Sequence, residues 1–251
     1  MQSHAGFVLL LACAAAHLAA EDAGNAVKNG NFEHWDDYSG GVTTTSVGVP
    51  SGSIAKDWYG GPGVNATATY DRLEFTENQT EVPGNPKYFF RVSWSKAPEG
   101  WTGEAHHLPD YRCTFLEYFG MGDVSTFAGK TLRVSFFARV MEGELDIVPI
   151  VWQSRDHVTP GITAVKGKGY ELFEAADTSG EVKVAQGRPR PAAICRLNTQ
   201  WQRFQKDITL PGMDGFSVSP GNYTGFGFDL IENGKPTIDI AQIVVQPISK
   251  E

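Results

Sequence analysis

The segments that decide the fold are Thr199-Gln-Trp-Gln-Arg-Phe-Gln-Lys-Asp-Ile-Thr-Leu-Pro211, Tyr223-Thr-Gly-Phe-Gly-Phe-Asp-Leu-Ile231 and Thr237-Ile-Asp-Ile-Ala-Gln-Ile-Val-Val-Gln246. Each alternates apolar and polar side chains with a period of two, which is typical of a strand that buries one face. Turn residues separate the segments. The alternation slips near Ala241, as a β-bulge would make it do. Three successive strands of this kind predict an all-β fold, a two-sheet antiparallel β-sandwich.

The composition agrees with such a fold. Of 251 residues, 41% are hydrophobic and 12% aromatic, and 28 Gly with 14 Pro indicate many turns. The formal net charge of −8 argues against a nucleic-acid partner, because no basic field is present to neutralise phosphates. No segment after residue 20 approaches the run of about 20 apolar residues that a membrane-spanning helix needs.

Residues 1–20 resemble an export signal. An apolar run, Phe7 to Leu18, is followed by Ala19-Ala20 and then by two acidic residues. We predict cleavage near Ala20 and a location outside the cytoplasm: secreted, periplasmic or at the cell surface. The alternative is a lipoprotein signal modified at Cys13, although the segment before this cysteine departs from the usual pattern. Residues 21–251 are then expected to form a single domain with a long insertion at about 154–194.

Removal of the signal leaves two cysteines, Cys113 and Cys195. In an exported chain such a pair predicts one disulfide. The alternative is two independent buried thiols.

Further strands are expected upstream of the C-terminal segments. Tyr88–Trp94 and Leu132–Val140 each have one apolar face, whereas Leu145–Gln153 is apolar on both faces. Pro149 within the last of these is expected at a bulge or bend. In the insertion, 170–175 and 181–186 are expected to pair as a hairpin.

Several short motifs follow one another along the chain. They are Asn29-Gly30-Asn31-Phe32-Glu33, Lys56-Asp57-Trp58, Phe127-Ala128-Gly129-Lys130-Thr131, the Trp201-Gln-Arg-Phe204 strand ending in Leu210-Pro211, and the closing Ile238-Asp-Ile-Ala-Gln242. In this order they resemble the jelly-roll carbohydrate-binding modules of the family 4/9/22 type, which are fused to cellulases and xylanases. They are also similar to modules of phage tail fibres. The resemblance covers 27–246 and implies jelly-roll topology, while function still has to be argued from a site.

The same resemblance implies a structural calcium ion. In those modules the opening glutamate and an aspartate of the closing strand hold Ca²⁺ together with backbone carbonyls. The matching positions are Glu33 and Asp239, and Asn31 could add an oxygen. The alternative is a solvent-facing Glu33 and an Asp239 that only follows the strand alternation.

Sugar recognition requires flat aromatic faces together with side chains that hydrogen-bond hydroxyl groups. Trp58 and Trp201 match framework positions and are expected in the core. The predicted ligand contacts are Trp152, Trp101, Arg155, Tyr118 and Arg139. For each of them, ordinary packing is the alternative.

Motifs of catalysis are lacking in the sequence. It contains no Gly-x-Ser-x-Gly, Walker or His-Glu-x-x-His motif, so no catalytic residue is predicted. His106, His107 and Asp110 lie in a Gly/Pro-rich segment, where a polar loop is expected rather than a metal site.

The leading hypothesis is a secreted non-catalytic protein that binds an oligo- or polysaccharide. The first alternative is a structural or adhesive jelly-roll protein that acts through a partner protein or a homo-oligomer. The second alternative is a glycoside hydrolase or polysaccharide lyase, since two carboxylates suffice for that chemistry.

Overall fold

Two antiparallel sheets dominate the computed structural model. The residues that the structure describes are 24–35, 44–45, 55, 57–60, 66–76, 82–97, 113–154, 156–157, 170–174, 184–185, 188–189, 194–210, 212, 216–217, 223–230 and 234–248. The first sheet has the order β1 (Thr44–Thr45), β3 (Thr67–Glu74), β4 (Tyr88–Lys96), β16 (Thr237–Ile248), β6 (Thr131–Val140) and β13 (Gln202–Thr209). The second has the order β12 (Cys195–Leu197), β7 (Leu145–Ser154), β15 (Thr224–Leu230), β5 (Cys113–Gly122) and β2 (Trp58–Gly60).

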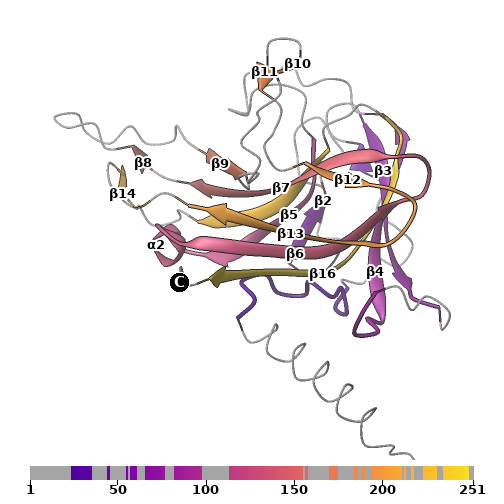
Figure 1. The fold of residues 1–251 in the computed structure, drawn as a ribbon, viewed down its shortest axis with the longest axis horizontal. Helices are drawn as coiled ribbons and strands as arrows, with labels where there is room; N and C mark the ends of the chain where they lie inside the picture. Colours follow the sequence, from indigo (N-terminus) through magenta and orange to yellow (C-terminus); the bar gives the residue numbers. More distant parts are fainter. Residues whose placement is uncertain are drawn as a thin grey trace, which may run out of the picture.

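The remaining elements are short. β9 (Tyr170–Glu174) pairs with β7 beside β12. β8 (Asp156–His157) pairs with β14 (Phe216–Ser217), and β10 (Val184–Ala185) pairs with β11 (Arg188–Pro189). α2 (Val124–Phe127) is a single turn between β5 and β6. The predicted β-sandwich is confirmed, and Figure 1 shows its two layers. In the described part of the chain, no helix is long and apolar enough to cross a membrane.

The core lies between the sheets and is rich in aromatic side chains. Phe136 and Phe228 face each other across the two layers, with ring centroids 4.8 Å apart. Burial of such large apolar surfaces is the main stabilising contribution to the fold. The largest fully buried side chains are Trp58, Tyr70, Tyr118, Phe32, Phe90, Phe115, Phe136, Phe226, Phe228 and Leu116.

The three C-terminal strands do not pair with one another. β13 pairs with β6, β15 lies between β5 and β7, and β16 lies between β4 and β6. The chain therefore alternates between the two layers, as a jelly roll does. The predicted bulge is confirmed, because the register of β16 shifts between Ala241 and Val244, and Gln242 between them has φ of 50°.

Pro149 is expected at a bulge or bend, and the β7–β15 register excludes a bulge there, since it runs without a shift through the pair Phe228–Pro149. On the other side of β7, β12 pairs with residues 145–147 and β9 with residues 150–154. Pro149 lies between these two partners, where it faces neither in register. A residue without a backbone N–H is tolerated at such a gap in the ladder.

The hairpin predicted within the insertion is also wrong. Tyr170–Glu174 pairs with β7 of the second sheet, and Val184–Ala185 pairs with Arg188–Pro189. The edge of β7 beyond β12 offers unpaired backbone groups to residues 170–174, and local alternation could not reveal that competing partner.

The predicted disulfide is contradicted by the registers of the second sheet. Cys113 is opposite Leu230, Leu230 is opposite Ile147, and Ile147 is opposite Cys195. The two cysteines thus occupy one row but are separated by three strand spacings, about 14 Å. A disulfide requires Cα atoms about 4.4–6.8 Å apart.

The first described residues lie along the last strand. Asn25 accepts a hydrogen bond from the Val245 amide at 2.9 Å and donates to the Ile243 carbonyl at 3.0 Å. The Ile243 amide donates to the Gly30 carbonyl at 3.0 Å, and the Ala26 amide to the Val245 carbonyl at 2.7 Å. In Figure 1 this indigo segment runs beside β16. The opening and closing segments therefore lie side by side.

Candidate functional site

The five predicted ligand contacts do not form one site. Trp152 belongs to β7, where it is opposite Gly225 on one side and Leu172 on the other. Its side chain lies outside the described residues, as do Trp101 and Arg155 entirely. Their role in binding stays a prediction.

Tyr118 is a core residue, so its predicted role as a ligand contact is wrong. Its side chain is 1% exposed, and its ring centroid lies 5.2 Å from that of Trp58. Burial raises the pKa of its hydroxyl group. The register Trp58–Tyr118–Phe226 turns all three side chains toward the core, where no glycan can reach them.

Arg139 lies on the first sheet, whereas Tyr118 and Trp152 belong to the second. Its Nε donates to Asp239 at 2.9 Å, and its Cζ lies 4.7 Å from the centroid of the Trp201 ring. Trp201 is 8% exposed and Trp58 is fully buried, which confirms both as packed residues. Arg139 is thus held between an acid and an aromatic ring within the protein.

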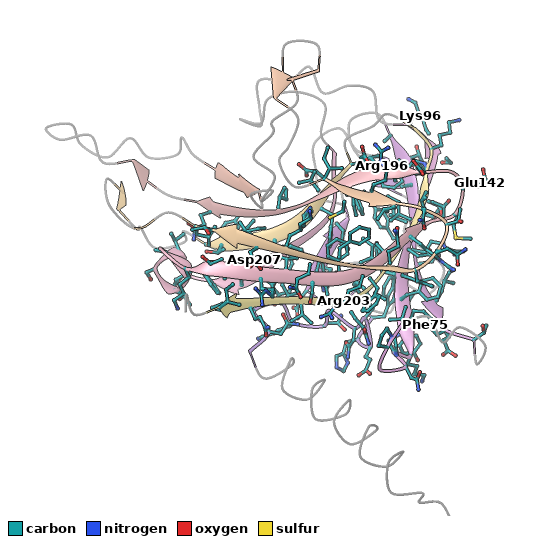
Figure 2. All side chains as sticks on the ribbon, viewed as in Figure 1. Phe75, Lys96, Glu142, Arg196, Arg203 and Asp207 are labelled. Atoms are coloured by element: carbon teal, nitrogen blue, oxygen red, sulfur yellow. The ribbon has the colours of Figure 1, made fainter. Side chains whose placement is uncertain are left out.

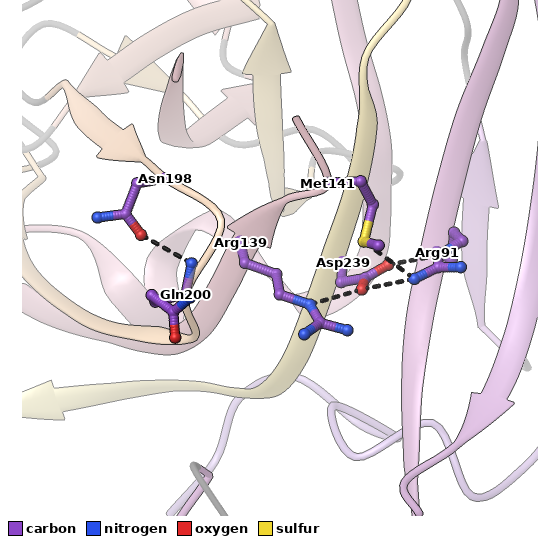
Figure 3. Close-up of polar contacts among 6 residues, drawn as sticks. All are labelled: Arg91, Arg139, Met141, Asn198, Gln200 and Asp239. Atoms are coloured by element: carbon purple, nitrogen blue, oxygen red, sulfur yellow. Dashed lines mark hydrogen bonds and ion pairs between the residues drawn. The ribbon is translucent and has the colours of Figure 1, made fainter. Parts of the chain in front are cut away.

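The calcium site predicted from Glu33, Asn31 and Asp239 does not fit this geometry. The Asp239 carboxylate is fully buried and accepts from Arg91 at 2.6 and 2.8 Å and from Arg139 at 2.9 Å (Figure 3). Two guanidinium groups therefore surround the oxygens that a cation would need.

Glu33 also lies on the wrong side of the sheet. It is exposed, and its carbonyl contacts Arg72, whose register partner Phe90 faces the core. Asp239 instead points outward with Arg91. Among the residues that the structure describes, no three His, Cys, Asp or Glu side chains gather as a metal site would require.

The outer face of the first sheet carries a row of alternating charge. Asp71, Arg91, Asp239 and Arg139 are successive register partners across β3, β4, β16 and β6. Opposite charges on neighbouring strands stabilise a sheet. This row explains Arg91 and Arg139 as structural residues.

A different group of side chains combines aromatic surface with open polar groups. We call Trp35, Arg72 and Tyr88, with the flanking Glu33, Glu74 and Lys87, the aromatic platform. It lies at the end of the β3–β4 pair that is near Phe75, which Figure 2 labels. Lys96 marks the other end of this pair.

Strand alternation explains why an arginine takes part. Ala68 and Tyr70 of β3 face the core, and Arg72 is the next residue on that face. The inner face of β3 reaches solvent at the end of the strand, so the guanidinium of Arg72 can reach water while the aliphatic part of its side chain remains packed. Glu74 follows two residues later and is opposite Tyr88 in register.

The guanidinium of Arg72 is fixed from several directions. Its Cζ lies 4.4 Å from the Tyr88 ring centroid and 5.9 Å from that of Trp35. Its Nη1 donates to the Glu33 carbonyl at 2.9 Å. Trp35 packs in turn on Phe90, with centroids 6.2 Å apart. Trp35, Arg72 and Tyr88 are each half-buried, so part of each side chain reaches solvent.

Among the described residues, the charged side chains of the platform are balanced in sign, and those of Glu33, Glu74 and Lys87 are exposed. Lys87 Nζ lies 4.8 Å from the Tyr88 ring centroid, and a hydrogen bond with Tyr88 raises the pKa of Lys87. Glu33 and Glu74 supply two carboxylates against the charges of Lys87 and Arg72. Aromatic rings with hydrogen-bond donors and acceptors around them are the groups that bind hydroxyl-rich ligands.

Sequence reasoning missed this platform although one signal pointed to it. An arginine at position 72 stands where the alternation Ala68, Tyr70 requires an apolar side chain. A charge at a core-facing position marks either a buried pair or the end of a sheet. The approach of Trp35 depends on the path of the N-terminal segment, which no local pattern specifies.

Comparison with known proteins gives structural likeness alone. Neither a family model nor a curated protein matches this sequence. The chain is similar in fold to a family 11 carbohydrate-binding module from Clostridium thermocellum in complex with a mixed-linked tetrasaccharide (12% identity over 86% of this chain and 95% of that chain, TM-score 0.41).

The chain is also similar in fold to two further solved structures. The CBM22-1 xylan-binding domain from Paenibacillus barcinonensis Xyn10C is 8% identical, covering 88% of this chain and 92% of that chain, with a TM-score of 0.42. A Stig cyclase from Fischerella sp. TAU is 9% identical, covering 91% of this chain and 98% of that chain, with a TM-score of 0.43. Carbohydrate-binding modules are thus among the structures that this jelly roll is similar to, as the sequence motifs predicted.

Proposed function

We propose that this protein is a secreted, non-catalytic carbohydrate-binding protein whose aromatic platform contacts the glycan. The observation that carries the proposal is the half-buried pair Trp35 and Tyr88 around the guanidinium of Arg72. A pyranose ring has a C–H face that packs on an aromatic ring, and its hydroxyl groups require donors and acceptors at the rim. Arg72 and Lys87 offer donors, and Glu33 and Glu74 offer acceptors.

The surroundings of three aspartates support a binding rather than a catalytic role. Asp239, Asp146 and Asp207 are each held by both Nε and Nη2 of an arginine at 2.6–2.9 Å. Both oxygens of such a carboxylate are occupied by an arginine, so neither is open to a substrate. Glycosidases depend on a pair of carboxylates of which one starts protonated.

The test is binding to a panel of soluble oligo- and polysaccharides by the wild-type protein and by Trp35→Ala and Tyr88→Ala. Each variant is expected to lose at least about tenfold in affinity, the loss expected when a main aromatic contact is removed. Tyr223→Ala is the matched control, because Tyr223 is a half-buried tyrosine packed against the second sheet. Circular dichroism and thermal unfolding establish that each variant is folded.

Trp152→Ala serves as the competing variant. Loss of binding in Trp152→Ala together with full binding in Trp35→Ala and Tyr88→Ala would move the site to the second sheet. Release of reducing ends from any bound glycan would contradict the non-catalytic role. Export is tested separately, since a mature N-terminus just after Ala20 in the exported fraction is expected.

A further inference from the structure

We infer that the aromatic platform prefers glycans that carry a carboxylate, the uronic-acid class. This inference rests on the proposed function, because it names the kind of sugar that the same platform takes. It depends on one edge of one guanidinium group, the Nε and Nη2 edge of Arg72.

Three other arginines show how this chain uses that edge. Arg91, Arg133 and Arg196 each donate through Nε and Nη2 to the two oxygens of an aspartate. The distances range from 2.6 to 2.9 Å. Two parallel N–H groups match the spacing of two carboxylate oxygens, which makes this bidentate pair stronger and more specific than a single contact.

Among the residues that the structure describes, no acid lies on the corresponding edge of Arg72. The Nη1 atom of Arg72 donates to the Glu33 carbonyl. Throughout the part of the chain that the structure describes, neither Nε nor Nη2 of Arg72 has a hydrogen-bond partner. The group is nonetheless positioned, because Tyr88 and Trp35 contact it and the Glu33 carbonyl fixes one corner. A ligand carboxylate therefore meets a donor pair that is already oriented, which reduces the entropy cost of binding.

The neighbouring charges favour a short-range interaction over long-range attraction. Arg72 and Lys87 balance Glu33 and Glu74, and the whole chain has a net charge of −8. Electrostatic steering of an acidic polymer toward the protein is therefore weak. Preference for the acid has to come from the bidentate contact itself, next to rings that pack on the sugar.

The experiment compares matched acidic and neutral ligands. The pairs are glucuronate with glucose, galacturonate with galactose, and polygalacturonate with its methyl-esterified form, measured by NMR titration and affinity electrophoresis. The wild-type protein is expected to bind the acid of at least one pair about tenfold more tightly than its neutral counterpart, a typical effect of one charge-assisted contact.

Arg72→Lys keeps the positive charge and removes the two parallel N–H donors, so the ratio of acid to neutral affinity is expected to fall from about tenfold to about one. Arg133→Lys is the control, because the edge of Arg133 is already occupied by Asp207. Equal binding of acid and neutral forms in every pair would overturn the inference, as would an unchanged preference in Arg72→Lys. If neutral glycans bind through Trp35 and Tyr88 without a preference for acids, only this inference fails. If no glycan binds at all, the proposed function fails with it.

Discussion

Arg91 holds both carboxylate oxygens of Asp239, with Nε at 2.6 Å from Oδ1 and Nη2 at 2.8 Å from Oδ2. The pair joins β4 to β16, and Arg139 joins β16 to β6 by donating to the same carboxylate. The hydrogen bond to Asp239 is the main cause of the raised pKa of Arg91. Three strands at the centre of the first sheet are thus connected through one buried acid.

Asp239→Asn should destabilise the protein, because it leaves two arginines without the charge that they surround. We expect the free energy of unfolding to fall by about 2–4 kcal/mol. This is close to the usual cost of breaking a buried ion pair, and it is somewhat lower because both arginines are partly exposed. Denaturant unfolding measures it. Asp207→Asn is the control, since the Arg133–Asp207 pair is exposed and should contribute at most about 1 kcal/mol. Equal losses in the two variants would contradict the central role of Asp239.

Calcium should have no effect that depends on Asp239. The carboxylate oxygens of Asp239 are occupied by guanidinium groups, so neither added calcium nor a chelator is expected to shift the melting temperature through this residue. Thermal unfolding of the wild type and of Asp239→Asn, each with calcium and with chelator, checks it. A calcium-dependent rise in melting temperature that Asp239→Asn abolishes would restore the predicted metal site.

Gly30→Ala should loosen the N-terminal segment from β16. A Cβ at residue 30 would overlap the carbonyl oxygen of Ile243, and this backbone cannot move without breaking its hydrogen bond to Gly30. We expect a loss of about 1–3 kcal/mol, the usual cost of overpacking, with faster proteolysis before residue 35. Gly24→Ala is the matched control in the same segment, because its Cβ would meet only Gln246 Oε1 at an ordinary 3.9 Å. The prediction fails if Gly30→Ala behaves like Gly24→Ala.

The thiol of Cys195 should resist alkylation in the folded protein. Burial raises its pKa from 9.0 to about 12, so the reactive thiolate is scarce at neutral pH. Because the folded state keeps its proton longer than the unfolded chain does, this residue lowers stability as pH rises from about 9 toward 12. Cys195→Ala should weaken that pH dependence.

The pairing of the cysteines is tested on the same protein. After unfolding without a reductant, Cys113 and Cys195 should both accept an alkylating reagent, as mass spectrometry can show. A mass that lacks two alkyl groups until reductant is added would contradict the strand registers that place the cysteines three strands apart.

The sequence by itself determined the strands. Period-two alternation in residues 202–209, 224–230 and 237–248 depends only on which side chains must avoid water, and this requirement acts along the chain. The bulge near Ala241 was readable for the same reason, because it follows from local parity. The packed tryptophans Trp58 and Trp201 were instead expected from the resemblance to the carbohydrate-binding modules.

Tertiary structure alone decided which strands are neighbours and which side chains meet. Asp239 fits the alternation equally well as a metal ligand or as an arginine partner, and only the registers of β4 and β6 bring Arg91 and Arg139 to it. Arg72, Trp35 and Tyr88 come from three separate segments, and Cys113 and Cys195 are kept apart by strands that the sequence does not order. Contacts between distant residues depend on pairing and layer packing, which local hydrophobic patterns leave open.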